Sequence, residues 1–254
     1  MAAGTDPVDL AACKEQGISV SSIPSASSEA VAEHAIALYL AVKRRIVHLH
    51  QLTMEGIEWG LRGTLVGEYH GLPKPCSQQT LGLIGYGHLG KRIQSIANAL
   101  GMRVLIADRK ETPIETLRYG RSSFSKTLED SDVIIIGIPL NETTRNIIST
   151  NELQQMRPTG ILVNVARGGV MDEAALVKAL KEGWISGAAT DVFSREPAKK
   201  GENMLLDLGN LNLNLIISPH VAWYASSSIQ NLKDTVKANV EGFLDRKPQN
   251  LVTV

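Results

Sequence analysis

The chain has 254 residues, enough to bury a sizeable core in one large domain or two small ones. Its 26 basic and 26 acidic side chains leave no net charge, which argues against nucleic-acid and anionic-membrane partners, because both require a basic surface. No apolar run approaches membrane-spanning length, and no signal-peptide pattern follows Met1. The two cysteines, Cys13 and Cys76, fit neither a zinc site nor a disulfide scaffold, so we expect reduced thiols in a soluble, cytoplasmic protein.

The stretch before residue 29 is too short to fold alone. Residues 4–20 predict a turn, a short helix over about 8–15 and a brief strand that ends near Val20. The small polar stretch SSIPSASS, residues 21–28, predicts a linker, and its last serine can cap the helix that follows.

A long helix is predicted from about Glu29 to His50 or beyond, because apolar residues recur at helical spacing. We expect His34 on this helix to be a packed, hydrogen-bonded side chain. His48 and His50 have no third partner at metal-ligand spacing, so no metal site is predicted. Five glycines and two prolines within residues 53–78 predict a loop or an irregular arm.

The next stretch has the pattern of a phosphate-binding turn. A short apolar strand, residues 81–84, leads directly into Gly85, Gly87 and Gly90 at G-x-G-x-x-G spacing. Gly85 permits a tight turn, Gly87 lets the main chain approach a pyrophosphate, and Gly90 lets the following helix lie close to the strand. That helix is apolar on one face and ends at Gly101, and its first N–H groups would point at an anion over the glycines.

A second apolar strand, residues 102–107, ends in Asp108, eighteen residues past Gly90. A carboxylate there can accept hydrogen bonds from a ribose diol, which completes the pattern of a dinucleotide site. Asp108 would repel a ribose 2′-phosphate and so favours NAD. Arg109 and Lys110 follow immediately and could attract that phosphate, so NADP stays open.

The rest of the chain alternates apolar strands with helices. Residues 111–131 are polar and poorly patterned, and no regular element is predicted there. The later strands are predicted at 133–138, 161–165, 185–192 and 215–217, and helices are predicted to begin near Ser149 and Asp172 and to span about 226–243. Strands that are apolar throughout are typical of a parallel sheet covered on both faces, so we predict a doubly wound α/β fold.

Ligands of this fold bind outside the carboxyl ends of the strands, so the residues after each strand are informative. Arg167 follows the strand at 161–165, Asp191 closes the next strand, and His220 follows the last one. Glu196 lies a few residues past Asp191 on the same edge. These residues are therefore expected to meet where the glycine turn places a cofactor.

Together they suit hydride transfer between a nicotinamide and a carbon that bears oxygen. His220 can carry the proton near neutral pH, Glu196 can fix its tautomer, and the planar fork of Arg167 can clamp a substrate carboxylate. Asp191 could bond the nicotinamide carboxamide. Taken singly, each could be an ordinary surface or loop side chain, and their convergence is what favours the oxidoreductase interpretation.

Three strings, GLIGYGHLGKRI, VNVARGGVMDEAALVKALKEGWISGAATDVFSREPA and ISPHVAWYA, resemble the D-isomer-specific 2-hydroxyacid dehydrogenases, which include phosphoglycerate, glycerate and hydroxypyruvate enzymes. The similarity extends from about Gly4 to the C-terminus. It implies Arg167, Glu196 and His220 as catalytic residues, and Trp223 in HVAW is reminiscent of glycerate and hydroxypyruvate enzymes, although an aromatic there could simply pack. The positions it places at the cofactor are Ser28, Gly85, Gly87, His88, Leu89, Gly90, Asp108, Arg109, Pro139, Val165, Ala166, Asp191 and Ala222.

The resemblance also implies a second, flavodoxin-like substrate domain, built mostly from residues ahead of the segment AAGTDPVDL with which this chain begins. We therefore expect a Rossmann-type NAD-binding domain over residues 29–222 and a truncated remnant of the substrate domain in residues 1–28 and 223–254. The loop that grips the substrate carboxylate is reduced to Ala3 and Gly4. Closure of the lid over the site would be compromised.

Residues 29–78, the long helix and its arm, match the region through which family members form dimers, so we predict a homodimer. Three functions stay open. The first is an NAD(P)-dependent dehydrogenase for a small 2-hydroxy or 2-oxo acid of the glycerate/hydroxypyruvate or glyoxylate type, with reduced or lost activity. The second is an NAD(H)-binding regulatory protein that acts through partners, and the third is a fragment without an independent role.

Overall fold

The computed structural model describes the whole chain except residues 1–3, 6–7, 70, 209–212 and 253–254. Its contacts divide the chain into two units. Unit 1 contains both ends of the chain, Met1–Val31 and Trp223–Val254, and unit 2 is the stretch between them, Ala32–Ala222.

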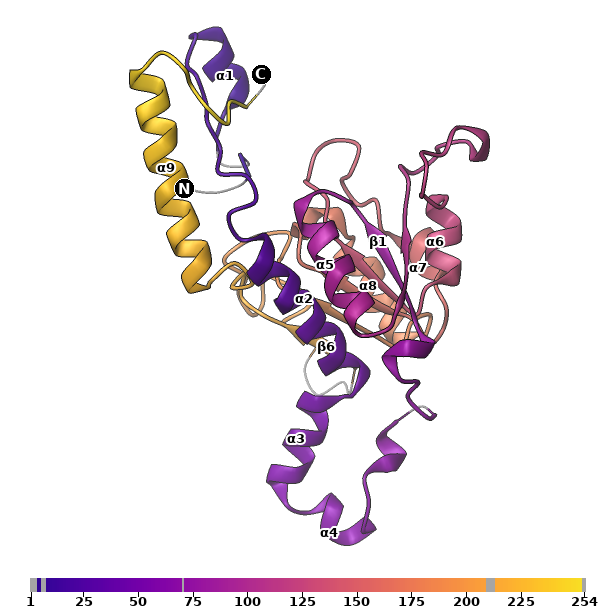
Figure 1. Cartoon of the computed structure of the whole chain (residues 1–254). Coiled ribbons are helices and arrows are strands. Elements are labelled where there is room, and N and C mark those ends of the chain that lie inside the picture. Colours follow the sequence, from indigo (N-terminus) through magenta and orange to yellow (C-terminus); the bar gives the residue numbers. More distant parts are fainter. Residues whose placement is uncertain (1–3, 6–7, 70, 209–212, 253–254) are drawn as a thin grey trace. The chain divides into compact units, whose positions relative to one another are not determined.

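Unit 2 is built on a parallel sheet, in which the described residues form six strands (Figure 1). The strands are β1 (Thr80–Ile84), β2 (Arg103–Ile106), β3 (Val133–Ile136), β4 (Ile161–Asn164), β5 (Gly187–Thr190) and β6 (Leu215–Ile217). Their order is β2-β1-β3-β4-β5-β6, and every neighbouring pair is parallel. The order reverses between β1 and β3, the switch point at which ligands bind in such sheets. The predicted doubly wound α/β class is confirmed.

Helices cover both faces of this sheet (Figure 1). The covering helices are α2 (Ser28–Lys43), α5 (His88–Ala99), α6 (Phe124–Asp130), α7 (Thr150–Gln155) and α8 (Glu173–Lys181). α5 packs against β1 and β2, and α2 packs on β5, where a Cβ at Gly187 would lie 2.6 Å from Cγ1 of Val42. α6, α7 and α8 pack on one another and enclose the main hydrophobic cluster with the strand residues Ile84, Ile134 and Leu162.

The long helix predicted from Glu29 is interrupted. α2 ends at Lys43, and α3 (Ile46–Glu55) begins after Arg45, whose φ of 48° is left-handed. A left-handed residue cannot continue a right-handed helix, so the prediction of one helix to His50 was wrong. α3 contains no buried residue, in contrast to α2, and its apolar side chains therefore do not continue the core-facing stripe.

Residues 53–78, predicted to be a loop or irregular, contain more regular structure than expected. From here on, the arm means residues 46–69. α3 is followed by α4 (Glu58–Arg62) and by 3₁₀ turns at Val66–Glu68 and Cys76–Gln78. The carboxylate of Glu68 lies 2.8 Å from Nε2 of His48 and 2.8 Å from Nη1 of Arg62. The hydrogen bond with His48 is the main cause that lowers the pKa of Glu68.

Residues 111–131, for which no regular element was predicted, contain a 3₁₀ turn at Ile114–Thr116 and the helix α6. Ser123 caps α6 by accepting an N–H of its first turn. The helix packs closely on β1, because a Cβ at Gly82 would lie 2.9 Å from Cγ2 of Thr127. A short helix of this kind is stabilised by its tertiary packing rather than by its own pattern.

Four strands are shorter than predicted. β2 covers only Arg103–Ile106 of the predicted residues 102–107. β3 stops at Ile136 rather than at residue 138, β4 stops at Asn164, and β5 covers only Gly187–Thr190. The residues beyond these ends belong to the loops at the carboxyl edge of the sheet, and those loops carry most of the predicted site residues.

Unit 1 contains two helices among its described residues, α1 (Leu10–Glu15) and α9 (Ser226–Leu244). Residues 18–20 form no strand, so the strand predicted to end near Val20 was wrong. Ser21 pairs with Leu251 only through an isolated antiparallel bridge. Asn239 adds a second link by donating to the carbonyl oxygen of Ser22 at 2.9 Å. In the described part of the chain, no helix combines the length and the apolar character needed to cross a membrane.

Candidate active site

The turn between β1 and α5 uses its three glycines in two different ways. Gly85 has a φ of 104°, and a Cβ there would lie 2.4 Å from the carbonyl oxygen of Gly137. A Cβ at Gly90 would lie 2.4 Å from the carbonyl oxygen of Gly85, so the fold itself requires these two glycines. A Cβ at Gly87 would meet nothing within 4 Å. This glycine therefore leaves open surface where a pyrophosphate would approach the main chain.

The start of α5 fits the same group. α5 begins at His88, and no side chain caps its first turn, because its N-cap residue is Gly87. Uncapped N–H groups and the positive end of a helix dipole attract an anion. Leu89 turns inward, since a Cβ at Gly137 would lie 3.4 Å from its Cδ2, and Pro139 lies exposed in the loop after β3. The residues present at this turn thus fit a dinucleotide.

Asp108 follows β2, as the sequence indicates, but its carboxylate is engaged within the protein. The residue is 5% exposed. Its Oδ1 accepts the main-chain N–H of Arg109 at 2.8 Å, and its Oδ2 accepts the main-chain N–H of Arg118 at 2.9 Å. The Arg118 guanidinium adds bonds to Oδ1 from Nη2 at 2.5 Å and from Nε at 3.0 Å. The hydrogen bonds from Arg118 hold the pKa of Asp108 well below its usual range.

Arg167 stands in the loop between β4 and α8, and two neighbours shape that loop. Asn164, fully buried at the end of β4, accepts the N–H of Ala166 at 3.0 Å and donates to the carbonyl oxygen of Arg167 at 2.9 Å. The Arg167 Nη1 donates to the carbonyl oxygen of Ala166 at 2.8 Å. Gly168 lets this loop touch the loop after β5, because a Cβ there would lie 1.9 Å from the carbonyl carbon of Phe193.

Glu196 is held in the loop after β5 and reaches His220. Its Oε1 accepts the N–H of Phe193 at 2.9 Å, and its Oε2 lies 2.6 Å from Nδ1 of His220. Glu173, in the first turn of α8, fixes the same loop by accepting the N–H of Ser194 at 2.6 Å. The carboxylate of Glu196 is therefore oriented by the main chain and presented to the imidazole.

His220 has an unusual backbone conformation, which Asp191 supports. Its φ is 54°, in the left-handed region, and its N–H donates to the carbonyl oxygen of Asp191 at 2.8 Å. The Asp191 carboxylate, 1% exposed, accepts the Ser218 hydroxyl at 2.6 Å and the N–H groups of Val221 at 3.1 Å and Ala222 at 2.9 Å. This carboxylate, expected at the nicotinamide carboxamide, is thus bonded to both sides of the loop that carries the histidine.

His34, on α2, extends this network. Its Nε2 lies 3.0 Å from Oγ of Ser218 and 3.5 Å from Oδ1 of Asp191. The prediction that His34 is a packed, hydrogen-bonded side chain is confirmed.

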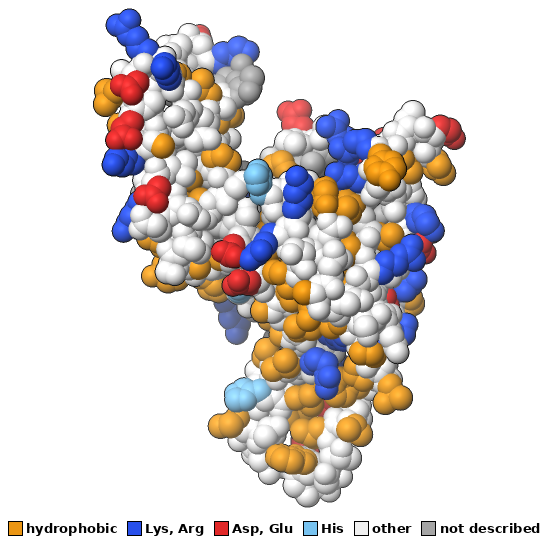
Figure 2. Space-filling model, in the orientation of Figure 1, with side chains coloured by type: hydrophobic (Ala, Val, Ile, Leu, Met, Phe, Trp, Pro, Cys, Tyr) orange, Lys and Arg blue, Asp and Glu red, His pale blue; other side chains and the backbone are white. Residues whose placement is uncertain are grey.

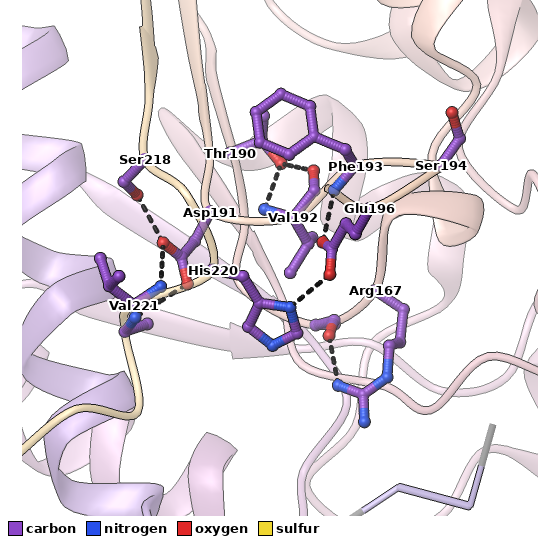
Figure 3. A network of polar contacts seen from close by, with 12 residues as sticks. Arg167, Thr190, Asp191, Val192, Phe193, Ser194, Glu196, Ser218, His220 and Val221 are labelled. Atoms are coloured by element: carbon purple, nitrogen blue, oxygen red, sulfur yellow. Dashed lines mark hydrogen bonds and ion pairs between the residues drawn. The ribbon is translucent and has the colours of Figure 1, made fainter. Parts of the chain in front are cut away.

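Three of the predicted side chains meet at one edge of the sheet (Figure 3). Arg167, Glu196 and His220 lie in the loops that follow β4, β5 and β6, which are adjacent strands. In Figure 3 the Glu196 carboxylate points at the His220 ring, and the Arg167 side chain extends on the same side of the loops as that ring. Val165 and Ala166 are buried in the first of these loops.

Several other predicted site residues do not belong to unit 2. Gly4, Ser28 and Trp223 belong to unit 1, where the Trp223 ring stacks edge-on against Tyr224 with centroids 5.4 Å apart. Ala3 lies outside the described residues.

The structure adds positioning residues that the sequence analysis did not name. They are Asn164, Gly168, Glu173, Ser218 and Arg118. A polar residue at the end of an apolar strand and a glycine pair after Arg167 were visible signals for the first two. Arg118 lies in a segment with no pattern, and its partner is ten residues away in the chain.

A doubly wound sheet whose glycine turn is open to a pyrophosphate, with an arginine and a glutamate–histidine pair along the same edge, defines a nicotinamide-dependent oxidoreductase. Sequence comparison gives the family. The model described as "D-isomer specific 2-hydroxyacid dehydrogenase, NAD binding domain" matches residues 36–222, and the chain therefore belongs to the NAD-dependent D-2-hydroxyacid dehydrogenases. The resemblance inferred from the three strings is confirmed.

Individual relatives agree with this assignment. The chain is 42% identical over 252 residues to the glycerate dehydrogenase of Methylorubrum extorquens, covering 99% of this chain and 76% of that protein. It is 35% identical over 244 residues to the glyoxylate reductase of Thermococcus gammatolerans, covering 95% and 71%. A solved structure of an NADPH-dependent glyoxylate/hydroxypyruvate reductase from Sinorhizobium meliloti, with NADP and malonate, matches with a TM-score of 0.81 and 30% identity, covering 99% and 76%.

Proposed function

We propose that this protein interconverts a small D-2-hydroxy acid and its 2-oxo acid by hydride transfer, with NAD(P) as cofactor. The substrate is of the glycerate/hydroxypyruvate or glyoxylate type. Arg167 binds the substrate, and His220, paired with Glu196, carries the proton.

The observation that carries this proposal is the 2.6 Å contact between Nδ1 of His220 and Oε2 of Glu196. Because Glu196 engages Nδ1, the proton is exchanged with the substrate oxygen through Nε2. The carboxylate also fixes the orientation of the ring, so that Nε2 can face the substrate oxygen. The pair therefore suits a reaction that adds or removes a proton at the oxygen of the reacting carbon.

The remaining groups supply binding and orientation. When bound over Gly87, the nicotinamide cofactor supplies or takes up the hydride. The Arg167 guanidinium offers parallel donors that match a carboxylate and polarise the adjacent carbonyl. We propose that the residues lining the cofactor are those set out in the sequence analysis, and that Gly4 and Trp223 contribute to the substrate side together with Ala3.

The names of the relatives support the substrate class. Those reported above are a glycerate dehydrogenase, a glyoxylate reductase and a glyoxylate/hydroxypyruvate reductase, and all three act on short 2-hydroxy or 2-oxo acids.

The test is a panel of 2-oxo acids, including glyoxylate, hydroxypyruvate and pyruvate, incubated with purified protein and either NADH or NADPH. We expect loss of reduced-cofactor absorbance with glyoxylate or hydroxypyruvate. Tight NADH binding without turnover of any acid would contradict the enzyme proposal and favour the regulatory alternative, while failure to fold would favour a fragment without an independent role.

We further propose a homodimer formed through α2 and the arm, in a dinucleotide domain spanning residues 29–222. The arm exposes several large apolar side chains on the molecular surface (Figure 2). They include Ile46, Met54, Ile57, Trp59, Leu61 and Val66. Apolar surface of this extent is typical of an interface. Light scattering at micromolar concentration should give twice the monomer mass, and a monomeric mass would contradict the proposal.

We also propose a cytoplasmic location. The two free thiols, Cys13 and Cys76, are consistent with it.

A further inference from the structure

The hydrogen bonds of Asp108 bear on the choice between NAD and NADP. A carboxylate has about four acceptor positions on its two oxygens. In this structure the two oxygens of Asp108 accept hydrogen bonds from the main-chain N–H groups of Arg109 and Arg118 and three more from the Arg118 side chain. A ribose diol therefore finds no vacant acceptor on Asp108 unless Arg118 leaves.

The pair also presents an asymmetric surface. The Asp108 side chain is 3% exposed, whereas the Arg118 side chain that covers it is 55% exposed. A group that approaches from solvent meets the guanidinium first. The repulsion expected between Asp108 and a 2′-phosphate is therefore largely cancelled at this surface, and part of the cation still faces outward.

Two further arginines lie next to this pair. Arg109 directly follows Asp108 and is exposed, and among the described residues its side chain has no ion-pair partner. Arg121 donates to the carbonyl oxygen of Ala107 at 3.3 Å. Burial lowers the pKa of Arg121, and the positive charge of Arg118 lowers it further, so the two guanidinium groups are close enough to interact. Of the three arginines, Arg118 bonds the carboxylate directly, Arg121 is close enough to interact with Arg118, and Arg109 is next to Asp108 in the chain.

The cluster adjoins the glycine turn. The guanidinium carbon of Arg121 lies 4.7 Å from the centroid of the Tyr86 ring, and Tyr86 stands between Gly85 and Gly87. A dinucleotide whose pyrophosphate lies over Gly87 would therefore carry its adenosine ribose toward the end of β2, where the cluster is.

We propose that Arg118 is the residue that makes this site accept the ribose 2′-phosphate of NADP(H), by neutralising Asp108 and offering its exposed guanidinium to the phosphate, with Arg109 and Arg121 beside it. The inference rests on the proposed function, in that it assumes a dinucleotide over the glycine turn. It predicts that the protein binds NADPH at least as tightly as NADH, in contrast to the preference for NAD that Asp108 alone would give.

The loop does not depend on the Arg118 side chain alone. The main-chain N–H of Arg118 also bonds Asp108, and the N–H of Asp108 donates to the carbonyl oxygen of Ser122 at 2.8 Å. Removal of the guanidinium leaves these two bonds, so an Arg118→Gln variant should fold.

The experiment is direct titration of NADPH and of NADH, followed by nucleotide fluorescence, in the wild type and in Arg118→Gln. We expect the wild type to bind NADPH at least as tightly as NADH, and Arg118→Gln to weaken NADPH at least tenfold while leaving NADH unchanged or tighter. Lys126→Gln, which removes one charge from an exposed pair with Asp130 on α6, is the matched control and should leave the NADPH/NADH ratio within twofold.

A second variant tests the inference even if Arg118→Gln folds poorly. Arg109→Gln removes an exposed side chain that forms no ion pair among the described residues, and it should weaken NADPH binding several-fold with little change for NADH. A wild-type preference for NADH above tenfold, or equal loss of both nucleotides in Arg118→Gln, would overturn the inference and leave the proposed function standing. Binding of neither nucleotide by the wild type would contradict the proposed function itself, and the inference with it.

Discussion

Nδ1 of His220 lies 2.6 Å from Oε2 of Glu196, and this contact determines which ring nitrogen serves the substrate. The same glutamate accepts the N–H of Phe193 through its other oxygen, so its orientation does not depend on the histidine. A base held by a carboxylate that the main chain itself orients is a preorganised acid–base pair.

Replacement of Glu196 by glutamine should preserve the shape of this pair and remove its charge. We expect kcat for 2-oxo acid reduction to fall by about tenfold to a hundredfold, less than the roughly 10²–10⁴-fold loss expected for His220→Gln, because general acid–base catalysis is weakened rather than abolished. Steady-state kinetics measure kcat in both variants, and NADH titration measures their affinity for the cofactor. Glu202→Gln, a neighbouring carboxylate paired with exposed Arg195, is the control and should retain full activity.

Arg167→Ala should remove turnover while leaving NADH affinity within about twofold, because the guanidinium is assigned to the substrate rather than to the cofactor. Arg167→Lys should recover only part of the activity, since an ammonium lacks the planar fork. Arg195→Ala, an arginine whose side chain is 80% exposed, is the matched control. Equal loss of activity and of NADH affinity in Arg167→Ala would show that the residue serves the fold instead.

Two glycines of the same turn should respond in opposite ways to alanine. Gly90→Ala places a Cβ 2.4 Å from a carbonyl oxygen and should lower the free energy of unfolding by about 1–3 kcal/mol, the usual cost of overpacking. Gly87→Ala meets no protein atom within 4 Å and should fold normally, but should weaken NADH binding at least tenfold. Urea denaturation and NADH titration of both variants separate the two effects. Normal NADH affinity in Gly87→Ala would mean that no pyrophosphate contacts this glycine.

Asp191→Asn tests whether this carboxylate positions the catalytic loop. An asparagine amide that donates would oppose the N–H groups of Val221 and Ala222, and the left-handed turn at His220 would lose support. We expect kcat to fall at least tenfold with little change in the KM for NADH. Ser218→Ala removes one of the three donors to Asp191 and should have a milder effect in the same direction. A raised KM for NADH at unchanged kcat would instead favour contact with the nicotinamide.

The Asp108–Arg118 pair should give stability a defined pH dependence. The folded-state pKa of Asp108 is depressed, so its contribution is present above the unfolded pKa of about 4 and is lost as the pH falls through the folded value. Asp108→Asn should therefore be less stable than the wild type at pH 7, and the difference should shrink as the pH falls from about 4 toward 2. Urea midpoints across this range provide the measurement. A difference that stays constant down to the lowest pH would show that Asp108 contributes through something other than its charge.

Much of this protein could be predicted from the sequence, because the features concerned depend on near neighbours in the chain. Fully apolar strands specify a sheet covered on both faces, and the spacing of Gly85, Gly87 and Gly90 specifies a turn between strand and helix. The topology of such a sheet places residues after successive strands on one edge, which is why the sequence alone groups Arg167, Glu196 and His220.

Tertiary structure alone decided the remaining features, since they depend on contacts between distant segments or on backbone conformations that carry no local pattern. Arg45, in a left-handed conformation, separates α2 from α3 within an apparently continuous helical pattern, and Gly82 of β1 lets α6 pack closely on the sheet. The carboxylates of Asp108 and Asp191 have the expected positions, but their partners are set by loops that return from elsewhere in the chain. A strand pattern determines where in the sheet a residue lies, whereas competition for hydrogen bonds in the folded protein determines what its side chain contacts.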